Sequence, residues 1–217
     1  MDSQRLFDAV EAAFARTGAA TPPWPSPRPP GQEPLEEEYS RCPDPGKYRI
    51  LRARGEAWAE ALSEAGLAVV EPVGPASWPH GADADLDRAV RVRPSKEQTV
   101  PLVLGFGAVQ DEPDASVTIG AGDPAVAVRT LPDCGCDACD SGSDDLLEEF
   151  DEYVSAIVNG ELVHLSGKGG SAVATGQGSS ASGEFALRDH TELLERARTG
   201  ESRGPAGLRV VHGARWW

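Results

Sequence analysis

Apolar residues recur every three or four positions in four segments of the chain, which is the spacing of a helix with one buried face. In the first segment, residues 3–17, this spacing places Leu6, Val10 and Phe14 on one side, and Gly18 follows as a typical helix-ending residue. The other three predicted helices cover residues 47–65, 143–158 and 189–199. The sequence therefore predicts four amphipathic helices.

Short apolar or alternating runs between these helices are typical of β-strands. They occupy residues 67–70, 88–94, 99–106, 116–120, 125–131, 161–165 and 207–213. Several of the connections are too short for the crossover that parallel strands require, which favours antiparallel pairing. A run of strands flanked by helices predicts an α+β fold with a mainly antiparallel sheet and helices packed on one face.

Two segments interrupt this pattern. Residues 21–34 contain seven prolines, which remove backbone donors and favour an extended connector that wraps the domain, although a ligand for an aromatic groove is an alternative. Residues 167–183 are rich in glycine and serine and are predicted to form a flexible loop. We expect one domain over residues 1–217, with these two segments as its irregular parts.

The formal charge of −15 over 217 residues limits the classes of partner that we expect. A surface with this charge repels phosphate backbones and anionic membranes, so we expect neither nucleic acid nor a membrane as a partner. It leaves open a protein partner, so one hypothesis is an acidic interaction protein that neutralises a basic partner. The first residues lack the apolar core of a signal peptide, and no apolar run reaches membrane-spanning length, so we expect a cytoplasmic protein.

The most specific chemistry lies in the segment LPDCGCDACDSGSDD, residues 131–145. Cys134, Cys136 and Cys139 fall within six residues, and neighbouring glycines let the backbone turn so that three sulfurs converge. Zinc prefers four thiolate or imidazole ligands in a tetrahedron, and this spacing supplies three of them. The segment therefore predicts a zinc half-site.

A fourth ligand is missing from the segment. His164, on the strand after the third helix, is our first candidate, and Cys42 and Asp137 are alternatives. The nearby carboxylates of Asp133, Asp137 and Asp140 oppose thiolate formation, whereas the N-terminus of the following helix favours it. Two serines are candidates for the N-cap of that helix, Ser141 and Ser143.

The cysteine cluster also permits interpretations that involve no metal. Cys136 and Cys139 form a CxxC ahead of a helix, which resembles a dithiol–disulfide motif and suggests a thiol-redox protein. The same pair fits a regulatory or incidental disulfide. A further interpretation is that the loop has no chemical role, with small thiols that are buried and carboxylates that cap the following helix.

The stretch LPDCGCDACDSGSDDLLEEFDEYV, with the upstream PDPGKYRILRARGEAWAEAL, resembles an actinobacterial family of uncharacterised proteins. The resemblance covers most of the chain, and CGCDACDSGS is its most distinctive part. It implies no activity, substrate or cofactor. The leading hypothesis is therefore a non-catalytic cytoplasmic domain whose cysteine-rich loop holds structural zinc.

Overall fold

The protein is described by a computed structural model that covers residues 1–29, 31–74, 86–187, 189–199 and 208–217. The four predicted α-helices are confirmed, and they are α1 (Ser3–Thr17), α2 (Arg49–Glu64), α3 (Ser143–Val158) and α4 (His190–Arg198). The second starts two residues later than predicted, because a 3-10 turn, η2 (Pro45–Tyr48), precedes it. No helix in these ranges is both long and apolar enough to cross a membrane.

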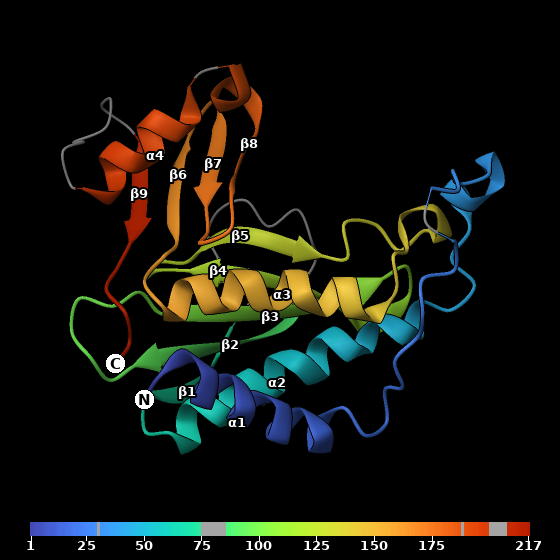
Figure 1. The fold of residues 1–217 in the computed structure, drawn as a ribbon, viewed down its shortest axis with the longest axis horizontal. Coiled ribbons are helices and arrows are strands. Elements are labelled where there is room, and N and C mark those ends of the chain that lie inside the picture. Colours follow the sequence, from blue (N-terminus) through green and yellow to red (C-terminus); the bar gives the residue numbers. More distant parts are fainter. Residues whose placement is uncertain (30, 75–85, 188, 200–207) are drawn as a thin grey trace.

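The strands form two antiparallel sheets (Figure 1). The larger sheet has the order β1-β2-β3-β4-β5, with strands β1 (Ala68–Val73), β2 (Leu86–Pro94), β3 (Leu102–Val109), β4 (Glu112–Ala121) and β5 (Val126–Leu131). The smaller has the order β8-β7-β6-β9, with strands β6 (Val163–Gly167), β7 (Gly170–Ala174), β8 (Ser179–Ala181) and β9 (Arg209–His212). The α+β class and the antiparallel pairing are confirmed, and the strands divide into two sheets.

The glycine- and serine-rich segment contains two strands that the sequence pattern did not indicate. The predicted flexible loop at 167–183 contains β7, which pairs with β6, and β8, which pairs with β7, as a meander. Ala172 and Ala174 are buried on one face of this meander beneath Phe185 and α4. Small side chains suit a strand that lies close under other elements. The composition of this segment nevertheless resembles that of a linker, so the sequence pattern does not indicate the two strands.

The main core lies between the larger sheet and the helices. Leu104 stands opposite Ile119 and Phe106 opposite Val117, and all four point to the same face, where α2 and α3 cover them. Figure 1 shows α2 and α3 along this face, with α1 alongside α2. The predicted arrangement of helices on one face of the sheet is thus correct for the larger sheet. Trp216, near the end of the chain, is buried in the same core.

Candidate metal centre

The cysteine loop connects β5 to α3 and contains one short 3-10 turn, η4 (Asp137–Cys139). The Sγ atoms of Cys134, Cys136 and Cys139 all lie within 4.8 Å of one another. The first two are 3.0 Å apart, and none of the chain's four cysteines is in a disulfide. Zn–S bonds of about 2.3 Å give a tetrahedron whose sulfurs are about 3.8 Å apart. The predicted convergence of three thiols is therefore present at close to this scale.

The thiol of Cys136 is the one best prepared to lose its proton. Hydrogen bonds from the Cys134 thiol, followed by those from the Cys139 thiol and from the backbone N–H groups of Ala138 and Cys139, lower its pKa against the opposing effect of burial. Cys136 is the N-cap residue of η4, and its carbonyl accepts a hydrogen bond from the Cys139 N–H at 3.1 Å. The sequence placed the nearest helix start several residues later and therefore missed this turn.

Cys139 shows the opposite behaviour. The thiols of Cys134 and Cys136, together with burial, raise the pKa of Cys139 to about 12. The cluster thus favours a thiolate at Cys136 and a neutral thiol at Cys139. A thiophilic cation changes the protonation of the thiols, because metal binding displaces protons from its ligands.

The carboxylates around the loop are each paired with a cation. Asp133 lies 2.7 Å from Arg129, Asp137 lies 2.6 Å from Arg41, and Asp140 lies 2.5 Å from Lys47. The sequence predicted that these carboxylates would oppose thiolate formation. Their pairing with cations offsets the electrostatic opposition to thiolate formation. The sequence does not reveal the pairing with Arg41 and Lys47, because these residues are distant from the loop along the chain.

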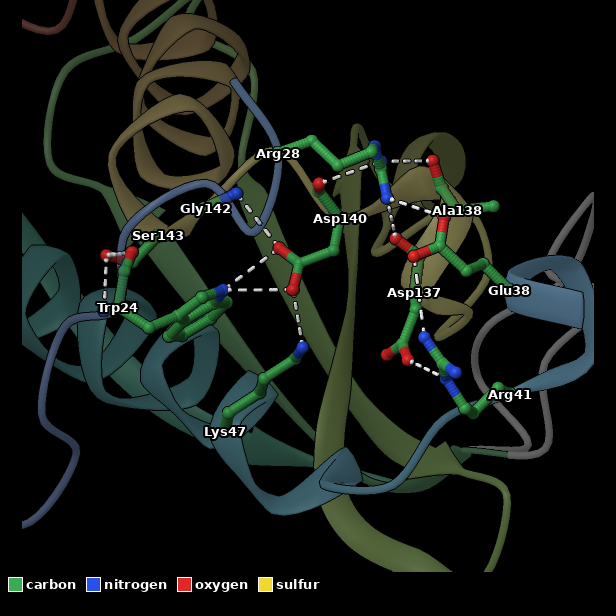
Figure 2. Close-up of polar contacts among 10 residues, drawn as sticks. All are labelled: Trp24, Arg28, Glu38, Arg41, Lys47, Asp137, Ala138, Asp140, Gly142 and Ser143. Atoms are coloured by element: carbon green, nitrogen blue, oxygen red, sulfur yellow. Dashed lines mark hydrogen bonds and ion pairs between the residues drawn. The ribbon is translucent and has the colours of Figure 1, made fainter. Parts of the chain in front are cut away.

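Arg28, from the proline-rich connector, fixes the backbone of η4. Its guanidinium donates to the carbonyls of Asp137 at 2.8 Å and Ala138 at 2.6 Å, and more weakly to that of Asp140 at 3.3 Å (Figure 2). Glu38 lies 3.4 Å from the same guanidinium, and both side chains are largely buried, at 15% exposure. The guanidinium therefore connects three backbone carbonyls of the cysteine loop to the proline-rich connector.

Asp140 forms a second attachment between the loop and the rest of the chain. Its carboxylate accepts from the indole N–H of Trp24 at 2.9 Å, from the Gly142 N–H at 2.9 Å and from Lys47 at 2.5 Å (Figure 2). The Lys47 ammonium also lies 5.5 Å from the Trp24 ring and 5.1 Å from the Tyr48 ring. Burial by itself raises the pKa of Asp140, but these hydrogen bonds outweigh it and bring the pKa below the usual 3.8.

This depressed pKa predicts a specific loss of stability in acid. Asp140 stabilises the fold fully above its unfolded pKa, near 3.8, and the contribution disappears as the pH falls through its lower folded value. We expect Asp140→Asn to reduce the free energy of unfolding by about 2 kcal/mol at pH 6 and by progressively less below pH 4. Urea unfolding of the variant and the unaltered protein between pH 6 and pH 2.5 measures the difference.

Asp111→Asn, at an exposed turn, is the matched control and should change the free energy of unfolding by less than about 0.5 kcal/mol throughout. A difference for Asp140→Asn that remains constant over the whole pH range would contradict the role given to the carboxylate.

The start of α3 is also held by the connector. The backbone of Trp24 pairs with Ser143, whose N–H donates to the Trp24 carbonyl at 3.0 Å and whose hydroxyl accepts from the Trp24 N–H at 3.1 Å. The N-cap is Gly142, so the predicted serine cap is wrong. Gly142 has φ of +97°, and a Cβ there would stand 2.6 Å from the Ser26 nitrogen. Only glycine permits this close approach of the connector.

The candidate fourth ligands are not part of the converging group. His164 is buried on β6 between Val173 and Val211, and burial lowers its pKa to about 4. Among the residues that the structure describes, the group of converging ligand atoms contains the three cysteines and no histidine. Cys42 is closer to the loop, since its Sγ lies 3.3 Å from the position that a Cβ on Gly135 would take. Burial raises the pKa of Cys42, which favours the neutral thiol.

Taken together, the fold and the loop define an α+β protein with a three-thiol cluster at a strand-to-helix junction. The chain matches a family described as "Family of unknown function (DUF6226)" over residues 10–217, and it therefore belongs to that family. No curated protein and no solved structure matches the chain. Membership confirms the resemblance to an uncharacterised family and assigns no activity, so the chemistry of the loop carries the functional argument.

Proposed function

We propose that this protein is a zinc-binding domain in which Cys134, Cys136 and Cys139 hold one zinc ion. The observation that carries the proposal is the convergence of the three sulfurs within 4.8 Å of one another on a single loop. Soft thiolate ligands select zinc, cuprous ions or iron–sulfur clusters over hard cations. Zinc fits best among these, because its four-coordinate sites are commonly built from closely spaced cysteines.

The attachment of the loop to the rest of the chain supports this proposal. Arg28 and Asp140 connect the loop to segments that are distant in the sequence, through contacts of 2.5 to 3.3 Å. A site that is held in place before the ion arrives has a smaller entropic cost of binding than a flexible loop. The lowered pKa of Cys136 adds to this, because the neighbouring thiols, above all that of Cys134, stabilise the charge of its thiolate.

The fourth coordination position belongs to a small exogenous ligand, water or a free thiol. Asp137 and Asp140 are engaged by Arg41 and Lys47, so neither carboxylate is available without breaking an ion pair. Cys134 and Cys139 are exposed, which gives an external ligand access to the ion. Three protein ligands with one open position are the pattern of zinc sites that exchange their fourth ligand.

Metal analysis of protein purified without a histidine tag tests the proposal. We expect one zinc per chain, with three of the four thiols protected from a thiol reagent until a chelator removes the ion. Less than about 0.1 zinc per chain, with all of the loop thiols freely reactive, would overturn it.

A thiol-redox function is the second candidate, and the lowered pKa of Cys136 is the observation that favours it. In this scheme the Cys136 thiolate attacks oxidised glutathione, one glutathione leaves, and Cys139 displaces the second to give a Cys136–Cys139 disulfide. The protein loses two electrons and two protons in total, which glutathione takes up. Equilibration of zinc-free protein with glutathione buffers measures the reduction potential. A value between about −180 and −300 mV supports redox chemistry, and a dithiol that these buffers never oxidise excludes it.

A further inference from the structure

A groove lies between α1, α2 and α3, away from the cysteine loop. It has a volume of about 680 Å³, which is within the range of sites for small organic molecules. Its lining combines aromatic side chains from α1 with carboxylates from α3. The groove therefore brings together two kinds of surface that attract the same class of ligand.

The α3 side of the groove is acidic. Asp144, Glu148 and Glu152 follow one another at intervals of four residues, so they lie on one face of the helix, and all three line the groove. Asp144 and Glu148 are exposed, and neither has an ion-pair partner in the described part of the chain. Glu152 accepts a hydrogen bond from the Thr175 hydroxyl, which leaves its charge in place.

The α1 side is aromatic. Phe7 and Phe14 are seven residues apart on the same face of α1, and both line the groove. Phe7 is 37% exposed, which is unusual for a phenylalanine beside a folded core. The Arg54 guanidinium already lies 5.3 Å from the centroid of the Phe7 ring and 4.9 Å from that of Phe14. The rings therefore supply apolar contact area for the body of a ligand, and the α3 carboxylates supply the attraction for its cation.

Arg54 lies at the floor of the groove, and its charge does not cancel that of the α3 carboxylates. The residue is 2% exposed, and its guanidinium binds Asp151 through two nitrogens, at 2.9 and 2.6 Å. It also donates to Glu11 at 2.6 Å. Two carboxylates thus already surround this one cation, so the floor is not a site for an anion.

We propose that this groove binds a small organic cation, an ammonium or guanidinium carried on an aromatic or branched apolar body. The apolar body lies against Phe7 and Phe14, and the cation lies between Asp144 and Glu148. The proposal is independent of zinc binding, because it uses none of the cysteine-loop residues and has its own ligand.

Three probes with the same apolar body and different charge test the proposal: 1-naphthylmethylammonium, 1-naphthylmethanol and 1-naphthoate. Titrations of the full-length protein, followed by calorimetry or by NMR shifts of α1 and α3 amides, give the dissociation constants. We expect saturable binding of the cation, at least roughly tenfold weaker binding of the alcohol and no binding of the carboxylate. Equal binding of cation and alcohol, or no saturable binding of the cation, would overturn the proposal.

A pair of double variants shows whether the groove is the site. Asp144→Asn with Glu148→Gln removes the two exposed groove carboxylates and should weaken cation binding roughly tenfold. Asp145→Asn with Glu149→Gln changes the net charge equally, on the same turns of α3, but at positions that do not line the groove. This control should bind within about twofold of the unaltered protein. Equal weakening by both pairs would show that binding is non-specific and would overturn the assignment.

Discussion

Replacement of Cys136 by serine should leave the protein with less than about a tenth of its bound zinc. The hydroxyl of serine remains protonated at neutral pH and is a poor zinc ligand, so the site loses one of its three protein donors. It also loses the thiol whose pKa is lowered by the neighbouring thiols and by the N–H groups of Ala138 and Cys139. With two cysteines left, and the nearby carboxylates held by cations, the loop lacks a replacement donor.

Zinc content after purification and the dissociation constant from chelator competition measure this loss. Cys42→Ser is the matched control, because the side chain undergoes the same chemical change at a cysteine outside the converging group. We expect this control to keep its zinc. Loss of zinc from Cys42→Ser, with retention in Cys136→Ser, would show that the three-thiol assignment is wrong.

Replacement of Arg54 by methionine should reduce the free energy of unfolding by about 3–5 kcal/mol. The side chain of Arg54 is 3% exposed and that of Asp151 is 12% exposed, so the variant leaves a carboxylate in the interior without its cation. The Trp58 indole N–H still donates to Asp151 at 2.6 Å, but a neutral donor does not offset the charge. The variant also breaks the contact between Arg54 and Glu11, which connects α2 to α1.

Urea denaturation at pH 7, followed by tryptophan fluorescence, measures this effect. Arg52→Met on the same helix is the matched control. Arg52 is 40% exposed, and its partners Glu56 and Asp114 are partly solvated, so its removal should cost less than about 1 kcal/mol. A cost for Arg54→Met no larger than that of Arg52→Met would show that the buried ion pair adds no stability.

The helices and most strands could be predicted from sequence because their apolar periodicity is a local signal. The pattern of Leu6, Val10 and Phe14 marks the inner side of α1, where the structure buries Leu6 and Val10 and partly buries Phe14. The strands β7 and β8 were missed for the opposite reason. Their glycine, serine and alanine residues have weak strand preference by themselves, and tertiary contacts with Phe185 and α4 determine their conformation.

For the candidate site, the sequence identified the three thiols and could not identify what surrounds them. Short spacing along the chain was enough to bring Cys134, Cys136 and Cys139 together. The roles of Arg28 and Lys47 depend on contacts with residues more than 90 positions away, which one sequence does not reveal. The apolar neighbours of His164 within LVHL were a local signal of burial, and the structure places this residue in the interior.

The attachment of the connector to the cysteine loop has a consequence for the order of folding. Trp24 and Asp140 are separated by 116 positions, and Arg28 and Ala138 by 110, so these contacts close one of the longest loops in the chain. Contacts of such long range form late, because the entropy lost on closure is regained only when the intervening elements are in place. During synthesis the connector leaves the ribosome long before the cysteines, so it cannot form these contacts until the cysteine loop has been synthesised. The thiols therefore remain accessible to oxidants until the last stage of folding, and refolding in a reducing buffer should give the higher yield of protein with intact thiols.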